Sequence, residues 1–350
     1  MPTPQPTHTV VFAAGQEGYH TFRIPAAIVT ARGTLLAFCE GRRGGMSDTG
    51  DIDIVLRRSF DGGRTFGPLQ VIADAGPDVF GNPCPVIDRD TGRIWLPLTH
   101  NLGHDEEHQI MAHTSEGTRT VWLMYSDDDG ASWSEPREIT ATAKREDWTW
   151  YATGPGVGIQ LRSGRLVIPC DHAVAETMQW RAHVIYSDDH GATWAIGGVT
   201  PDKTNECQVA ECADGSLILN MRAYREQGCR AIVRSEDGGL TWGEMWDDEA
   251  LIEPVCQASL LRTGDLGGLL VFSNPASRTE REKMTVRLSE DDGKTWPFAR
   301  EIYAGPAAYS CLAELADGTL GCLYERGVEH AYEELAWARF DVGWVKEADR

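Results

Sequence analysis

The sequence predicts an all-β protein, a six-bladed β-propeller, and three observations support this fold class. Five short segments repeat one turn pattern along the chain, strand-like runs lead into each of them, and no long amphipathic helix interrupts the series. Repeats of roughly 50 residues that carry several short strands each are typical of propeller blades, which pack radially and so protect their edges.

The repeated segments read S-x-D-x-G-x-[ST]-[WF], and we call them Asp boxes; they begin at Ser59, Ser126, Ser187, Ser235 and Ser289. The aspartate can accept hydrogen bonds from turn N–H groups, the glycine can adopt a positive φ, and the final aromatic can pack into a neighbouring core. Successive boxes start 67, 61, 48 and 54 residues apart, so a chain of 350 residues holds about six units. The boxes are expected to be structural turns without a chemical role.

Strand signals follow in order along the chain. The N-terminal run His8–Ala13 is expected to pair with strands near the C-terminus and so close the sixth unit, which lacks a box. The runs that lead into the boxes are IDIVLRRS, VWLMYS, AHVIYS, CRAIVRS and MTVRLS, which alternate or are apolar at strand length. Further turn and strand signals lie in DGSLILN and DGTLGCLYE, and the last predicted strand is Leu335–Val345.

Composition limits the classes of function. With 41% hydrophobic residues and 12 tryptophans, residues 1–350 can form a single domain with a large core. The net charge of −21 argues against nucleic acid as a partner and against anionic lipid. No apolar run reaches the roughly 18 residues of a membrane span, and the start lacks the features of a signal peptide. We therefore expect a cytoplasmic protein, or a secreted one if an export signal has been removed.

Cysteine usage is also consistent with a reducing compartment such as the cytoplasm. The nine cysteines are scattered and show no CxxC spacing, which argues against both a disulfide framework and a zinc site. We expect most of them to be buried free thiols.

Arginines interrupt otherwise apolar strands in several units. Arg23 follows Phe22, Arg222 ends the run LILNMR, and Arg281 leads into MTVRLS. An unpaired buried charge is costly, whereas guanidinium groups bind carboxylates bidentately, so a cluster of them could hold an acidic ligand. Taken singly, each could instead form a salt bridge within a blade.

These motifs together resemble the bacterial and animal exo-sialidases. The resemblance rests on FRIP at 22–25, on the Asp boxes, and on the glutamate of NECQ standing sixteen residues ahead of the arginine of LNMR. It implies that Arg23, Arg222 and Arg281 clasp the carboxylate of sialic acid, with Arg278 and Arg287 as alternatives to Arg281. Glu325 in CLYERG resembles the glutamate that holds the FRIP arginine in place.

The resemblance also implies the reacting groups. Tyr309 in AAYSCL matches the nucleophile and Glu206 matches its base; a phenol suits this role because a carboxylate would be repelled by the substrate's own carboxylate. Asp48, nine residues before Arg57, matches the acid that protonates the leaving group, with Asp51 and Asp53 as rivals.

The implied reaction is retaining hydrolysis of a terminal α-linked sialic acid from a sialylated glycan or sialoside. It proceeds through a tyrosyl intermediate and needs no metal or organic cofactor. Arg42, or alternatively Arg43, matches the arginine that contacts the hydroxyl edge of the sugar. Alternatives are hydrolysis of a related nonulosonic acid, transfer to an acceptor, a non-catalytic sialic-acid-binding propeller and a protein-interaction scaffold. The oligomeric state is left open.

Two further stretches carry weak signals. HNLGHDEEHQIMAH brings together His100, His104, His108 and His113, but the spacing matches no known ligand set, so we expect a polar loop that shapes the pocket and not a metal site. WTWY at 148–151 offers aromatic surface for a sugar, although a place in the blade core or rim explains it equally well.

Overall fold

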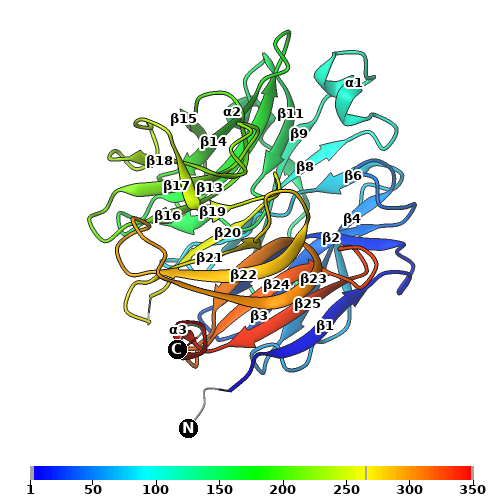
Figure 1. The fold of residues 1–350 in the computed structure, drawn as a ribbon. Coiled ribbons are helices and arrows are strands. Elements are labelled where there is room, and N and C mark those ends of the chain that lie inside the picture. The colour runs from blue at the N-terminus through cyan, green and yellow to red at the C-terminus, as the bar shows by residue number, and fades with distance from the viewer. Residues whose placement is uncertain (1–3, 265, 348–350) are drawn as a thin grey trace.

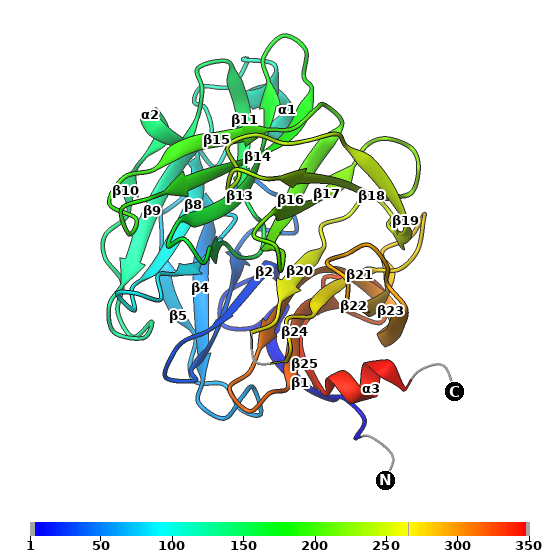
Figure 2. The same ribbon diagram turned by 90° about the vertical axis from the view of Figure 1, so that its left-hand side faces the viewer.

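The computed structural model describes residues 4–264 and 266–347, and its strands, which pair almost entirely antiparallel, curve around a common centre (Figures 1 and 2). The domain predicted over 1–350 therefore includes residues 1–3, 265 and 348–350, which lie outside the described residues. The all-β propeller class is confirmed, while the number of six blades stays a prediction from the repeat spacing.

The strands form four sheets within the described ranges. The first contains, in hydrogen-bonded order, β1 (Thr7–Ala13), β25 (Glu334–Phe340), β24 (Leu320–Arg326), β23 (Phe298–Glu314), β22 (Glu282–Ser289), β21 (Leu270–Pro275) and β20 (Ser259–Arg262). The second contains β10 (Arg137–Glu138), β9 (Thr120–Ser126), β8 (Ile94–Asn101), β6 (Val79–Gly81), β4 (Ile52–Ser59), β3 (Leu35–Arg42) and β2 (Thr21–Val29), with β5 (Gln70–Ala73) beside β4 and β7 (Val86–Ile87) beside β8.

The other two sheets are smaller. The third contains β11 (Trp148–Thr153), β13 (Leu166–Val174), β14 (Trp180–Ser187) and β15 (Ala195–Val199), with β12 (Ile159–Gln160) beside β13. The fourth contains β16 (Thr204–Glu211), β17 (Leu217–Ala223), β18 (Cys229–Ser235) and β19 (Trp246–Ile252). The described helices are short: α1 (Glu107–Met111), α2 (Thr140–Ala143) and α3 (Val342–Lys346). None of the described helices is long and apolar enough to cross a membrane.

The N-terminal strand closes the fold, as predicted. β1 pairs antiparallel with β25, with Thr7 opposite Arg339 and Ala13 opposite Glu334. Figure 1 shows this closure as the blue β1 lying alongside the red β25. The ends of the described chain thus share one sheet, and no long edge is left open between the first and last strands.

The predicted last strand, Leu335–Val345, is too long. β25 ends at Phe340, and the chain turns at Asp341 into α3. Trp344 packs on Phe340 with ring centroids 5.8 Å apart, and Val345 is also buried. The residues after Asp341 form one short helical turn that buries Trp344 and Val345, where we expected the strand to continue.

The Asp boxes are turns of the predicted kind. In the first box, Asp61 accepts hydrogen bonds from Ser59 Oγ at 2.8 Å and Thr65 N at 2.9 Å, and the same bonds recur in the other four. Gly63 has φ +84°, and a Cβ there would come within 2.2 Å of Trp337 Nε1. The glycine is therefore required both by its backbone conformation and by its close approach to β25.

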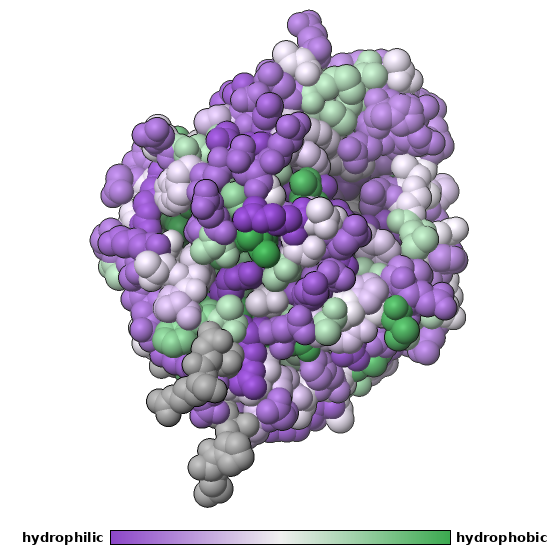
Figure 3. Space-filling view, in the orientation of Figure 1, coloured by the Kyte–Doolittle hydropathy of each residue, from purple (hydrophilic) through white to green (hydrophobic). Residues whose placement is uncertain are grey.

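The core lies between successive sheets, and all eight residues of β3 are buried. The nine cysteines are buried free thiols, as predicted. On the face seen in Figure 3, hydrophilic residues predominate and apolar ones are scattered. The residues of the predicted site lie on strands of three of these sheets, with Arg23 on β2, Glu206 on β16 and Tyr309 on β23.

Candidate active site

One cavity of about 210 Å³ gathers the predicted residues from across the chain. Seven of the eight line it: Arg23, Arg42, Asp48, Glu206, Arg222, Arg281 and Tyr309. They come from β2, β3, β16, β17 and β23, from the loop after β3 and from the segment before β22. The eighth, Glu325, is fully buried on β24 behind Arg23.

Glu325 joins Arg23 to the backbone of two strands. Its oxygens accept from Arg23 Nε at 3.1 Å and Nη2 at 3.3 Å, and also from the N–H groups of Ile24 and Tyr309, each at 3.0 Å. Ile24 has φ +60°, an unfavourable conformation for a β-branched residue, which persists where surrounding contacts hold it. The guanidinium of Arg23 also lies 4.2 Å from the ring centroid of Tyr332. A buried cation is thereby paired and held in place.

Tyr309, Glu206 and Arg222 form a second group. The phenol of Tyr309 donates to Glu206 Oε1 at 2.5 Å, while Arg222 Nη1 lies 2.7 Å from Glu206 Oε2 and 3.3 Å from Tyr309 Oη. Burial, and next the charge of Glu206, raise the pKa of Tyr309 well above its usual value, although Arg222 acts in the opposite direction. The phenol therefore carries its proton in the free protein, and that proton already points at a carboxylate able to take it.

Arg281 completes a set of three cations around the tyrosine. Its Nη1 donates to Tyr332 Oη at 2.9 Å, and its guanidinium lies 5.7 Å from the ring centroid of Tyr309. The alternatives lie elsewhere: Arg278 bonds to the carbonyls of Gln227 and Gly228, and Arg287 bonds to Asn274. Of the three candidates, Arg281 is the one that lines the cavity.

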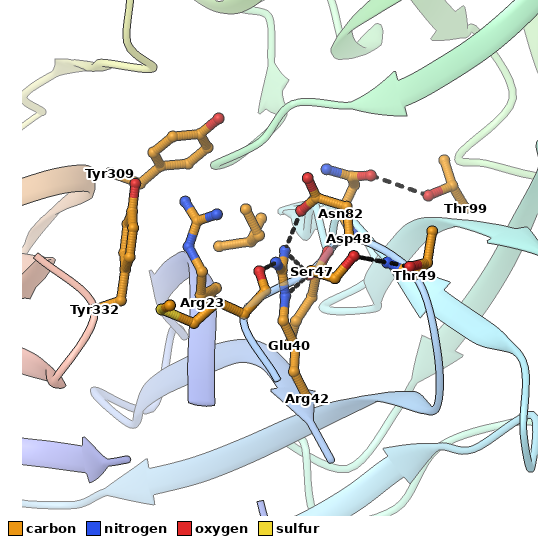
Figure 4. Close-up of polar contacts among 12 residues, drawn as sticks. Arg23, Glu40, Arg42, Ser47, Asp48, Thr49, Asn82, Thr99, Tyr309 and Tyr332 are labelled. Atoms are coloured by element: carbon orange, nitrogen blue, oxygen red, sulfur yellow. Dashed lines mark hydrogen bonds and ion pairs between the residues drawn. The ribbon is translucent and has the colours of Figure 1, made fainter. Parts of the chain in front are cut away.

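Asp48 lies across the cavity, on Arg42. Figure 4 shows Arg23 between the two tyrosine rings on one side and Asp48 with Arg42 on the other. Asp48 Oδ1 is 2.6 Å from Arg42 Nη2; the Asp48 side chain is 55% exposed, whereas that of Arg42 is 2% exposed. Burial acts to raise the pKa of Asp48, but Arg42 and then Arg23 outweigh it and hold the pKa below its usual value. Asp48 is thus an accessible carboxylate in the free protein.

The rival residues of this loop turn away from the cavity. Arg43 bonds to Asp51 Oδ1 at 3.1 Å and to Asp53 Oδ2 at 2.6 Å, and Asp53 also accepts from Tyr19 at 2.5 Å. None of these four residues lines the cavity. The structure therefore favours Asp48 over Asp51 and Asp53, and Arg42 over Arg43.

Sequence reasoning missed part of the cavity wall. The additional polar and aromatic lining residues are Glu40, Asn82, Arg119, Asp171, Trp180, Asn205 and Tyr224. Glu40 holds Arg42 at 2.6 Å and stands two residues before it on β3, so the two-residue period of a strand could have revealed it. Asp171 interrupts the apolar run of β13, as Arg23 does in β2, whereas Arg119 stands in a polar stretch just before β9 and carries no such signal.

The histidine-rich stretch and WTWY, which carried weak sequence signals, each contribute a residue to the cavity wall. Glu107, from the histidine-rich stretch, lines the cavity on α1, so this loop helps to shape the pocket. In WTWY, Trp150 lines the cavity, whereas Trp148 stacks on His172 inside the core.

One group in the described residues has metal-ligand geometry. Asp88, Asp90 and His190 bring ligand atoms within 4.8 Å of one another, away from the cavity. Asp88 already accepts from Thr91 and Gln160, so this group forms a hydrogen-bonded network around an Asp-box residue.

Known proteins match both the chain and its fold. Residues 33–322 match the BNR repeat-like domain family. Human sialidase-3 is 32% identical over 91% of this chain and 89% of its own length. The chain belongs to the sialidase family. The sialidase of Micromonospora viridifaciens is 36% identical over 92% of this chain, and the chain spans 53% of that protein's length. The solved Hadza microbial sialidase Hz136 superposes with a TM-score of 0.87 at 31% identity, covering 97% of this chain and 69% of its own.

Proposed function

We propose that the protein is an exo-α-sialidase that releases terminal α-linked sialic acid from glycoconjugates with retention of anomeric configuration. The observation that carries the proposal is the 2.5 Å hydrogen bond from Tyr309 to Glu206 inside a ring of three arginines. A phenol with a carboxylate base is suited to attack a carbon that already bears a carboxylate, because the neutral nucleophile meets no charge repulsion.

In the first step, Arg23, Arg222 and Arg281 bind the substrate carboxylate. Tyr309 Oη forms a bond to the anomeric carbon while its proton passes to Glu206, and the glycosidic C–O bond breaks as Asp48 protonates the leaving oxygen. In the second step, Asp48 removes a proton from water, the water oxygen attacks the anomeric carbon, and Tyr309 leaves and recovers its proton from Glu206. Two inversions give retention.

Substrate binding prepares Asp48 for its role as an acid. In the free protein Arg42 and Arg23 keep its pKa low. A carboxylate placed on Arg23 adds negative charge nearby, and the sugar displaces water from the exposed Asp48 side chain. Both changes favour the protonated carboxyl, so the acid forms when the substrate is in place.

The test is fluorescence release from the 4-methylumbelliferyl α-glycoside of N-acetylneuraminic acid. We expect turnover by the intact protein, and a loss of kcat of about 100-fold or more in Tyr309→Phe, which removes the nucleophilic oxygen. Asp48→Ala should lose less on this activated leaving group than on sialyllactose. Asp51→Ala is the matched control, because Asp51 bonds Arg43 outside the cavity.

The stereochemistry gives an independent check. Proton NMR of the early product should show the α-anomer of the free sugar before it equilibrates. A β-anomer formed first, or an active Tyr309→Phe variant, would contradict the tyrosyl intermediate. Failure of the intact protein to cleave either substrate would contradict the proposed activity.

A further inference from the structure

Two polar side chains in the cavity wall, Asp171 and Asn205, have no part in the steps above. Asp171 lies on β13 and Asn205 on β16, and they are 1% and 5% exposed. Asn205 Nδ2 donates to Asp171 Oδ1 at 2.9 Å. The other oxygen, Asp171 Oδ2, is buried without a hydrogen-bond partner. A buried polar atom without a partner costs free energy, so a ligand that bonds to it gains that interaction.

The surroundings of Asp171 favour its uncharged form. Burial first, and then the negative charge of Glu206, raise its pKa well above the usual value, while Arg222 only partly offsets this. Because Oδ1 accepts from Asn205, the proton belongs on Oδ2. Asp171 is then a hydrogen-bond donor in the cavity wall, unlike the carboxylates of Glu206 and Asp48.

The position of the pair is set by its neighbours. Asn205 immediately precedes Glu206, and the charges that act most on Asp171 are those of Glu206, Arg222, Glu107 and Arg119. In Figure 1, β13 and β16 lie side by side in the upper part of the fold, and β3, which carries Arg42, lies in the lower part. The pair therefore lines the cavity from β13 and β16, which lie apart from the part of the fold where β3 carries Arg42.

The position of Asp171 and Asn205 indicates which part of the substrate they contact, and this inference rests on the proposed function. A sialic acid whose carboxylate lies on the three arginines, and whose ring hydroxyl faces Arg42, directs its three-carbon exocyclic chain away from Arg42. That chain carries hydroxyl groups that can accept a hydrogen bond, and its carbon atoms can pack on Trp150 and Trp180, which also line the cavity.

We propose that Asp171, held by Asn205, donates a hydrogen bond to a hydroxyl of the exocyclic chain and makes the site selective for substrates that keep the full chain. The pair is thus a specificity-determining element, separate from the residues that make and break bonds.

The test compares two methylumbelliferyl sialosides, one with the intact chain and one whose chain has been shortened to a single carbon by periodate oxidation and borohydride reduction. The ratio of kcat/KM for the two substrates is measured for the intact protein, Asp171→Asn and Asp171→Leu. Asp171→Asn is the matched control, since its amide N–H can replace the O–H donor while its oxygen still accepts from Asn205.

We expect the intact protein and Asp171→Asn to prefer the full chain by about tenfold, and Asp171→Leu by less than about threefold, as for the loss of one hydrogen bond. A purely structural role would lower both rates and leave the ratio unchanged. If Asp171→Leu does not fold, Asn205→Ala, which releases Asp171, should lower the ratio in the same way.

Two results would overturn the inference while the proposed function stands: an unchanged ratio in Asp171→Leu, or an equal loss in Asp171→Asn, which would mean that no neutral donor is at work. Cleavage of neither substrate by the intact protein would overturn the proposed function and the inference with it.

Discussion

Glu325 supports two different parts of the candidate site. It bonds the side chain of Arg23 and the backbone N–H groups of Ile24 and Tyr309, so Arg23 and the proposed nucleophile share one support. Because Glu325 is fully buried, its removal leaves Arg23 as an uncompensated buried charge.

We predict that Glu325→Gln lowers the free energy of unfolding by about 3 kcal/mol and lowers kcat/KM together with it. Urea unfolding followed by fluorescence, and the methylumbelliferyl assay, measure the two effects. Glu17→Gln is the control, because Glu17 pairs with Arg57 at the surface and should cost less than about 1 kcal/mol. Equal losses in the two variants would contradict the supporting role of Glu325.

Among single residues, the sequence predicted those that stand in a local motif and missed those that only tertiary contacts bring to the site. Arg23 and Tyr309 stand in recognisable local patterns. Tyr332, by contrast, contacts both Arg23 and Arg281 from the segment between β24 and β25, where no local signal marks it. Contacts of this kind depend on how distant strands pair, which a local pattern does not contain.

Within the third sheet, two strands carry a buried histidine pair. His172 on β13 and His183 on β14 approach with their Nδ1 atoms 3.0 Å apart, and His183 Nε2 lies 3.1 Å from Tyr151 Oη. Burial lowers the pKa of both imidazoles. Nearby positive charge, including that of Arg145, lowers both pKa values further. Both rings are therefore neutral in the folded protein.

This pair predicts a loss of stability in acid. The unfolded chain binds protons below about pH 6.5, while the folded pair does not, so the free energy of unfolding falls as the pH drops through that value. We expect His172→Phe, which keeps the packing on Trp148, to reduce the loss between about pH 7.5 and 5.5 by about 1.4 kcal/mol. Urea titrations at both pH values measure the difference. His113→Asn is the control substitution, because His113 is exposed and lies outside the buried pair.

Strands were predicted correctly where the sequence shows a clear strand pattern before an Asp box. The runs before the Asp boxes are strands β4, β9, β14, β18 and β22, and the boxes have the expected hydrogen bonds. The prediction was wrong at the end of β25, because four apolar or aromatic positions after Asp341 fit a helical turn as well as a strand. Packing on Phe340 decides between them, and that contact is tertiary.

For the whole molecule, closure by β1 is the feature on which stability should depend most. Phe12 is 2% exposed and packs on Phe22 with ring centroids 5.2 Å apart, whereas Val10 on the same strand is 48% exposed. We predict that Phe12→Ala lowers the free energy of unfolding by about 3 to 5 kcal/mol and Val10→Ala by less than about 1 kcal/mol. Thermal or urea unfolding distinguishes them. Similar losses would mean that β1 does not seal the core.

The ring closure also has a consequence for the order in which the protein is made. Arg23 is translated early, and its partner Glu325 follows 302 residues later, after Tyr309. A growing chain therefore carries Arg23 without this partner through most of its synthesis. The first and last strands must both have left the ribosome before the pocket exists, so a prematurely terminated chain has no finished site.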